Sequence, residues 1–333
     1  MKKTLLITMV AALVLVGCST KRQYFETENI EKELSYTSSL SSSIVSSNSA
    51  GATLKNGDII TKDGVKSGYG LDKGYSMLSS NDGLIIAANI DGDLRVKNSG
   101  GISIYSHKFP EAIVSAALKD DQLAAISANN NLYLLDINKD EVLMQYASRE
   151  VYAIDSRAAS PVFLGSIIIY PSLDGKIYIL NRATSQLVKD VTISSDEFFN
   201  NVIFLDTTGD TMIAATAKRV ISISPEKTVY YDGEIKDVLV HDKDVYILKK
   251  DGTILRTDLD LVVKNKAYFK FAIFTGASIN DGNLYAVEKT GYLFKMGLDL
   301  SDEQIYKLPS EIDERSYISG GTLYFGDRYL NLK

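Results

Sequence analysis

A pair of short apolar segments recurs along most of this chain, at a spacing of about 40 residues. The first segments of the seven pairs are LIIAA, LAAIS, IIIY, TMIAAT, VYIL, LYAVE and LYF, which begin at Leu84, Leu123, Ile167, Thr211, Val245, Leu284 and Leu323. The second segments follow within a few residues and are DLRVK, LYLLD, IYILN, VISIS, TILRT, YLFKM and RYLNL. A fixed period of this size indicates a repeat architecture, and short strands at this spacing are typical of the blades of a β-propeller.

We therefore predict an all-β chain that folds as a β-propeller of seven four-stranded blades, with eight blades as the alternative. A sandwich with evenly spaced strands also fits an all-β pattern, but seven paired matches disfavour it. Asp-Gly between apolar runs is the strongest short-range signal for a hairpin, and it occurs seven times. The pairs begin at Asp63, Asp82, Asp91, Asp174, Asp232, Asp251 and Asp281.

The two ends of the repeat region suggest how the ring closes. The sequence stops at Lys333, directly after a segment that matches the third strand of a seventh blade. The segment Gly57–Gly64 (GDIITKDG) precedes the first complete repeat. We predict that this N-terminal strand completes the last blade, since closure removes the exposed sheet edge of an open ring.

The N-terminus has the three parts of a secretory signal. Lys2 and Lys3 give a short positive start, residues 5–16 are almost wholly apolar, and the small Gly17 precedes Cys18. The apolar run is too short for a membrane-spanning helix, and its place behind two lysines disfavours a core helix. Residues 15–18 (LVGC) resemble the lipobox of bacterial lipoproteins. This resemblance implies cleavage after Gly17 and acylation, by chains such as palmitate, of Cys18, the one cysteine in the sequence.

We divide the chain into a signal peptide (1–17), a lipidated N-terminus with a flexible tether (18–50) and a propeller (51–333). The tether is predicted from Ser35–Ser49, where nine of fifteen residues are serine and little apolar surface can be buried. Ser19 stands where lipoproteins retained in the inner membrane usually have aspartate. We expect a lipoprotein of the bacterial outer membrane that faces the periplasm, held in the membrane by its anchor at Cys18.

The best-preserved repeats are Asp174–Val188 (DGKIYILNRATSQLV) and Asn130–Tyr146 (NNLYLLDINKDEVLMQY). They resemble the DG-x-L-Y-A-L-D-x-x-T-G repeat of the pyrroloquinoline-quinone-type propellers. The positions that match are Asp174, Gly175, Ile177, Tyr178, Leu180, Asn181, Thr184, Leu132, Tyr133, Leu135 and Asp136. Together with a lipobox, the repeats resemble the lipoprotein subunits of the outer-membrane β-barrel assembly machinery. That family implies a noncatalytic scaffold that binds the barrel-forming pore subunit.

The chain departs from this family in two respects. It has no tryptophan, so the tryptophans that end each family repeat are missing, and Tyr146 replaces one of them. The family ring usually has eight blades, whereas the sequence shows seven copies of the pair. The tyrosines at alternating strand positions, such as Tyr133, Tyr178, Tyr246 and Tyr285, are expected to pack between blades.

No catalytic, metal-binding or cofactor site is predicted. The quinone enzymes of this fold class commonly use adjacent cysteines, but the single cysteine lies in the lipobox. Asp91-Gly92-Asp93 falls where a hairpin must turn and lacks the further oxygen ligands of a calcium loop. The two histidines, His107 and His241, are expected at surface positions or strand ends. With 42 acidic against 36 basic residues, the chain is also a poor match for nucleic acid.

A protein-binding loop is the best candidate for a functional site. In SSDEFFNN, Phe198 and Phe199 are adjacent, and two neighbouring side chains of an extended strand cannot both point inward. We predict that Phe198, Phe199 and Asn200 contact a protein partner. The alternative is that one ring packs under the loop and the other between blades.

Three functions fit these observations. The first is a scaffold in outer-membrane β-barrel assembly, with the pore subunit as its protein partner. The second is an interaction or adhesion lipoprotein of another envelope complex, in motility or surface binding. The third, a periplasmic propeller enzyme, is disfavoured because no set of catalytic side chains converges in the sequence.

Overall fold

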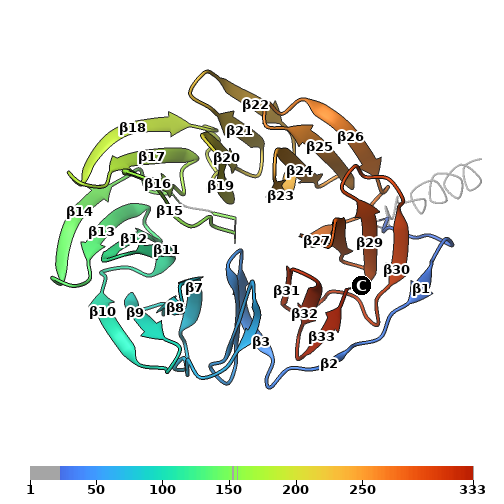
Figure 1. Cartoon of the computed structure of the whole chain (residues 1–333), viewed down its shortest axis with the longest axis horizontal. Helices are drawn as coiled ribbons and strands as arrows, with labels where there is room; N and C mark the ends of the chain where they lie inside the picture. The colour runs from blue at the N-terminus through green and yellow to red at the C-terminus, as the bar shows by residue number, and fades with distance from the viewer. Residues whose placement is uncertain (1–22, 152–153, 156, 333) are drawn as a thin grey trace, which may run out of the picture.

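The computed structural model describes residues 23–151, 154–155 and 157–332, and Figure 1 shows them as a ring of sheets around a central axis. Eight separate sheets make up the ring, and each has at least four strands. The prediction of a β-propeller is therefore confirmed, with eight blades, the larger of the two numbers that the sequence permitted. Within the described residues, no helix is long and apolar enough to cross a bilayer.

Blades 1 to 4 follow one another along the chain, and each runs from an inner strand to an outer strand. Blade 1 contains β3 (Ile44–Asn48), β4 (Gly51–Leu54), β5 (Ile59–Thr61) and β6 (Gly64–Lys66). Blade 2 contains β7 (Ser76–Asn81), β8 (Leu84–Ala88), β9 (Asp93–Asn98) and β10 (Ser103–Lys108). Blade 3 contains β11 (Ile113–Lys119), β12 (Gln122–Ser127), β13 (Asn131–Asp136) and β14 (Glu141–Ala147). Blade 4 contains β15 (Val162–Leu164), β16 (Ile167–Pro171), β17 (Lys176–Asn181) and β18 (Gln186–Thr192).

Blades 5 to 8 complete the ring, and the last two also take strands from the N-terminus. Blade 5 contains β19 (Phe204–Thr208), β20 (Thr211–Ala215), β21 (Arg219–Ile223) and β22 (Thr228–Asp232). Blade 6 contains β23 (Ile235–His241), β24 (Asp244–Lys249), β25 (Thr253–Asp258) and β26 (Val263–Tyr268). Blade 7 contains β27 (Phe274–Asn280), β28 (Asn283–Glu288), β29 (Tyr292–Gly297), β30 (Gln304–Lys307) and, as a fifth strand, β1 (Lys32–Glu33). Blade 8 contains β31 (Ser316–Ser319), β32 (Thr322–Phe325), β33 (Arg328–Asn331) and β2 (Ser38–Ser39).

The repeated apolar segments are the two middle strands of blades 2 to 8. In β12, for example, five of the six residues are buried, because neighbouring blades cover both faces of the sheet. The outer strand β18 is exposed along most of its length, since only one of its edges is paired and it lies on the rim. Full burial of the middle strands explains their continuous apolar sequences and their prominence in the repeat.

The core of the ring is divided into eight hydrophobic clusters, one at each junction between neighbouring blades. The predicted tyrosines belong to these clusters: Tyr133 lies between blades 2 and 3, Tyr178 between blades 3 and 4, and Tyr246 between blades 6 and 7. The eighth cluster joins blade 8 to blade 1 and closes the ring. Tyrosines therefore pack between blades as predicted.

The ring is closed from the N-terminus, but by different residues from those predicted. Gly57–Gly64 does not complete the last blade; it contributes β5 to a blade of its own. The closing strand is β2, in which Ser38 and Ser39 pair with Tyr329 and Arg328 of β33. A strand at the rim is held by backbone hydrogen bonds and needs few apolar side chains, so its serines gave no strand signal.

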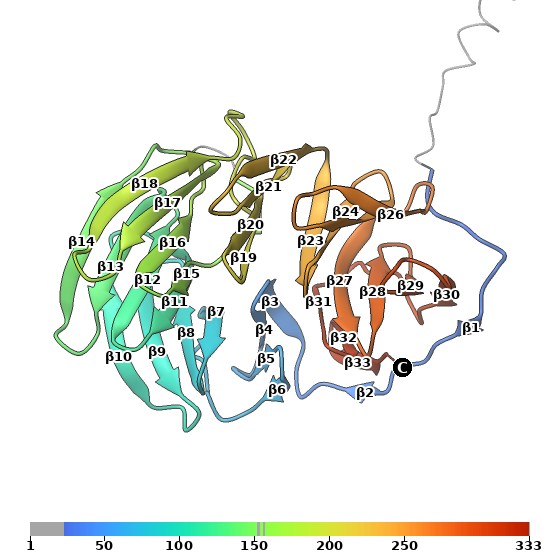
Figure 2. The same cartoon turned by 45° about the horizontal axis from the view of Figure 1, so that its top comes forward.

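The same finding corrects the boundary at residue 51. Residues 23–40, which we call the strap, run along the outside of blades 7 and 8 (Figure 2). Residue 44 already begins the inner strand of blade 1. The strap is fixed near its start by Phe25, which is 7% exposed and lies among Phe269, Tyr292 and Phe294, with ring centroids 5.0–6.2 Å apart. The part of the predicted tether that the structure describes is thus bound to the ring.

One repeated hydrogen bond organises a single face of the ring. The turn between the second and third strands of a blade presents a glycine carbonyl to the backbone N–H that follows the outer strand. The bonds run from Leu71 to Gly57, Phe109 to Gly92, Ile193 to Gly175, Phe269 to Gly252 and Leu308 to Gly291. These turns and the connections between blades form what we call the loop face.

Candidate functional site

The connection between β18 and β19, residues 193–203, places both predicted phenylalanines on the loop face. Phe198 is 52% exposed and Phe199 is 56% exposed, so the alternative of one ring under the loop and one between blades does not hold. Phe199 also has a φ of 54°, in the left-handed region that bulky residues rarely adopt. Such backbone strain costs about 1–3 kcal/mol and is concentrated in functional loops. Partner contact by these rings remains a prediction.

Asn200, the third predicted contact residue, is buried rather than exposed on the loop face. Its side chain is 4% exposed, and Nδ2 donates to the carbonyl oxygens of Asp174 (3.0 Å) and Ser194 (2.9 Å). A buried amide cannot reach a partner, so the predicted contact role is replaced by one in shaping the loop. Asn200 holds the turn of Asp174 against the connection that carries the phenylalanines.

Asn201 joins this connection to the preceding one, residues 148–161. Its Oδ1 accepts a hydrogen bond from the backbone N–H of Asp155 (2.6 Å), and its Nδ2 donates to the carbonyl oxygens of Asp155 and Arg157. Arg157 in turn donates from Nε and Nη2 to the two carboxylate oxygens of Asp155 (2.8 and 2.6 Å). The phenylalanine loop is therefore braced by a fully buried amide and a bidentate ion pair.

Arg157 belongs to a charged cluster where the inner strand of blade 6 begins. Burial alone would raise the pKa of Asp155, but the hydrogen bonds and charge of Arg157 outweigh burial and lower it. Burial lowers the pKa of the Lys236 ammonium, and the nearby Arg157 lowers it further. Burial raises the pKa of Asp237. Nη1 of Arg157 is buried and has no hydrogen-bond partner among the described residues. The cluster thus combines two cations with two carboxylates, and one nitrogen of Arg157 is left without a protein partner among the described residues.

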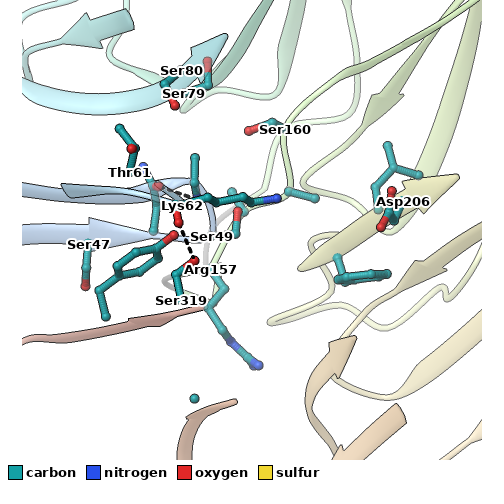
Figure 3. Close-up of a pocket in the computed structure, with 18 of the residues that line it drawn as sticks. Ser47, Ser49, Thr61, Lys62, Ser79, Ser80, Arg157, Ser160, Asp206 and Ser319 are labelled. Carbon is teal, nitrogen blue, oxygen red and sulfur yellow. Dashed lines mark hydrogen bonds between the residues drawn. The ribbon is translucent and has the colours of Figure 1, made fainter. Parts of the chain in front are cut away.

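The cluster lines the central cavity of the ring, which has a volume of about 1800 Å³. Small hydroxyl side chains from several blades line it as well, Lys62 extends into its open space, and Arg157 lies on its wall (Figure 3). The serines labelled there are Ser47, Ser49, Ser79, Ser80, Ser160 and Ser319. Cations at the loop-face end include Lys236, Lys250 and Arg315. This open polar cavity can take water, ions or a partner's side chains at its mouth.

The other residues that the sequence singled out for chemistry are distributed around the ring. His107 lies within β10, with its ring 4.6 Å from that of Phe109, and His241 is the last residue of β23, beside Asp242. Asp91 lies in a hairpin turn, where its backbone N–H donates to Asn89 Oδ1. Over the described ranges, no three His, Cys, Asp or Glu side chains are grouped as metal ligands. Gly17 and Cys18 lie outside the described residues, so cleavage and acylation remain predictions.

The sequence analysis found the phenylalanine loop but not its brace. Arg157, Asn201 and Lys236 come from three different connections or strands, and only the ring brings them together. Asn200-Asn201 was a signal for this brace, because an amide side chain both donates and accepts hydrogen bonds and can join two backbone segments.

Comparison with known proteins gives sequence relatives that align with nearly the whole chain. No protein-family model matches the chain. Over 388 aligned residues it is 28% identical to plasminogen-binding protein PgbB of Helicobacter pylori, in each of two strains. The alignment covers 99% of this chain and 71% of the relative. This is distant homology along nearly the whole chain.

Solved structures match the ring at lower sequence identity. BamB from Moraxella catarrhalis has a TM-score of 0.63 and 14% identity, with 91% of this chain and 96% of that chain covered. The C-terminal WD40 domain of Sif2 has a TM-score of 0.63 and 12% identity, with 92% of this chain and 100% of that chain covered. Proteins with different names match equally well, so the likeness shows the propeller fold alone.

Proposed function

We propose that the chain is a noncatalytic, lipid-anchored propeller of the bacterial envelope that binds a protein outside the cell, with plasminogen as its first candidate partner. The observation that carries this proposal is the 28% identity to plasminogen-binding protein PgbB over 99% of this chain. The likeness to BamB extends to the fold alone, so the findings support surface binding more than a role in barrel assembly.

In the proposed function, Cys18 is the residue that carries the lipid anchor. The LVGC sequence and the apolar segment before it support acylation there, and several acyl chains give stable membrane attachment. Phe25, seven positions further on, is bound between blades 6 and 7, so the propeller would be held close to the membrane.

The binding surface is proposed on the loop face, at Phe198 and Phe199. Exposed aromatic rings on a braced loop lose little conformational entropy on binding, and aromatic residues are enriched among the side chains that dominate interface energies. The neighbouring cavity wall carries Arg157 and Lys236 beside Asp155 and Asp237, so it would favour polar side chains of a partner over apolar ones.

A direct binding assay tests this proposal. The acylated full-length protein, purified in detergent, is titrated against immobilised plasminogen. We expect saturable binding, and Phe198→Ala combined with Phe199→Ala should raise Kd by about 10- to 100-fold, because two aromatic contacts are lost.

Tyr230→Ala is the matched control, since Tyr230 is a half-exposed aromatic residue on the outer strand of blade 5. It should leave Kd unchanged. An unchanged Kd for the double variant would contradict the proposed surface, and absence of plasminogen binding would contradict the proposed partner. Recovery of the barrel-assembly pore subunit from crosslinked membranes, without plasminogen binding, would favour the barrel-assembly scaffold instead.

A further inference from the structure

A second group of exposed aromatic and basic side chains lies at the start of the strap. Tyr268 ends the outer strand of blade 6 and is 55% exposed, and Phe271 in the next connection is 38% exposed. Lys266 lies 5.8 Å from the centre of the Tyr268 ring, and Lys270 lies 4.8 Å from the centre of the Phe271 ring. We call these four residues, together with Lys289, the strap-side patch.

Lys289 joins the patch through the backbone. Its N–H donates to the carbonyl oxygen of Ile273 at 2.9 Å, which places the exposed turn of blade 7 beside the connection that carries Phe271. Across the ranges that the structure describes, Lys266, Lys270 and Lys289 form no ion pair with an acidic side chain. The patch therefore combines apolar rings with three positive charges that no carboxylate neutralises, in a chain of net negative charge.

Phe271 is also strained. Its φ is 67°, in the left-handed region where a bulky residue is an outlier, and the neighbouring Phe269 and Ala272 are buried. The hydrogen bond from Ala272 N–H to the Phe269 carbonyl closes this tight turn. This strained turn buries Phe269 and exposes Phe271 to solvent.

The strap limits how far the proposed lipid anchor can lie from this patch. Phe25 contacts Phe269, two residues from Phe271, and Tyr24 precedes it at the surface. Cys18 lies seven positions before Phe25, so even a fully extended chain keeps the two within about 25 Å. After Phe25 the strap runs along the outside of blade 7, where β1 pairs with β30 (Figure 2).

We propose that the strap-side patch is a membrane-contact surface, on which Tyr268 and Phe271 enter the interfacial region of the bilayer while Lys266, Lys270 and Lys289 face anionic headgroups. This inference rests on the proposed anchor at Cys18. Aromatic rings and lysines are the side chains that favour the membrane interface. The contact fixes the orientation of the ring, with blades 6 and 7 toward the membrane and blade 3, on the opposite side of the ring, away from it.

The absence of tryptophan from the sequence makes a direct test available. The acylated full-length protein is reconstituted into vesicles of zwitterionic and anionic phospholipids whose acyl chains carry bromine, which quenches nearby tryptophan. Each variant carries one tryptophan, as Tyr268→Trp, Val142→Trp in the outer strand of blade 3, or Tyr230→Trp in that of blade 5. All three positions are exposed, so each variant should fold, and circular dichroism checks this.

We expect Tyr268→Trp to lose at least about half of its emission in brominated vesicles, while the other two reporters lose little. Changing Lys266, Lys270 and Lys289 to Gln in the Tyr268→Trp variant should weaken its quenching, since each lysine near an anionic surface contributes about fivefold to binding. Equal quenching of the three reporters in vesicle-bound protein would contradict membrane contact by the strap-side patch, but it would not contradict the lipid anchor at Cys18. Failure of the protein to float with vesicles would overturn the Cys18 anchor and, with it, this orientation.

Discussion

At the residue scale, the loop face depends on backbone conformations that few side chains tolerate. Gly92 and Gly83 are both the second residue of an Asp-Gly pair in blade 2, with φ values of 87° and 77°. A Cβ atom at Gly92 would lie 2.5 Å from the carbonyl oxygen of Phe109, whereas nothing lies within 4 Å of a Cβ atom at Gly83. The first glycine supports the connection between two blades, and the second only turns a hairpin.

The two glycines should therefore differ in how strongly a substitution by alanine destabilises the protein. Gly83→Ala should lower the free energy of unfolding by about 1 kcal/mol, the ordinary cost of a left-handed alanine. Gly92→Ala should cost about 2 kcal/mol more, because the carbonyl of Phe109 must also move. Urea unfolding of the two variants checks the prediction, and equal midpoints would contradict the role of Gly92 in holding the connection.

Some of the features of the phenylalanine loop could be predicted from the sequence. Phe198 and Phe199 were predictable because adjacent aromatic residues in a polar loop cannot both be buried in one strand. The bracing by Asn201 and Arg157 was not, because their hydrogen bonds join connections far apart in the sequence. The burial of Asn200 was missed because its side chain is held by the carbonyl of Asp174, on a turn 26 positions earlier, as well as by that of Ser194 in its own loop.

At the element scale, the sequence predicted the middle strands of the blades, which neighbouring blades cover on both faces. Full burial demands continuous apolar segments, and these repeat in blades 2 to 8. Blade 1 was missed because its middle strands, β4 and β5, are shorter and its inner strand β3 lies in the serine-rich region. The strap was read as a free tether since rim strands need backbone pairing more than apolar side chains.

The role of Phe25 in holding the strap against the ring can be tested by mutation. Phe25→Ala removes a buried ring from among Phe269, Tyr292 and Phe294, and such a loss costs about 3–5 kcal/mol when the site cannot collapse. We expect residues 23–40 to become sensitive to protease and to exchange backbone hydrogens faster, while the middle strands of blades 2 to 6 stay protected.

Ile30→Ala is the control, because Ile30 also lies in the strap but its side chain is exposed. It should leave the protection of the strap nearly unchanged. Equal protection in the wild type and in Phe25→Ala would show that the strap is held by its strand pairs alone and that Phe25 does not fasten it.

At the scale of the whole molecule, the eight blades form a closed ring whose two ends meet through β2 and the cluster between blades 8 and 1. The strap starts at blades 6 and 7, whereas the phenylalanine loop lies between blades 4 and 5 on the loop face. Phe271 and Lys289 of the membrane-contact patch also lie on the loop face, one in a connection between blades and the other in a turn. In the proposed orientation, the patch and the partner-binding loop therefore share this face but lie at different junctions of the ring.

The most direct test of the central claim is photo-crosslinking at position 198 in intact cells that display the acylated protein, after addition of plasminogen. Phe198 is replaced by a photoreactive phenylalanine analogue, and the same analogue at Val142, on the outer strand of blade 3, is the control. The account predicts a light-dependent adduct with plasminogen at position 198 and none at position 142. An adduct with the barrel-assembly pore subunit, or no adduct at 198 under conditions where plasminogen binds, would contradict it.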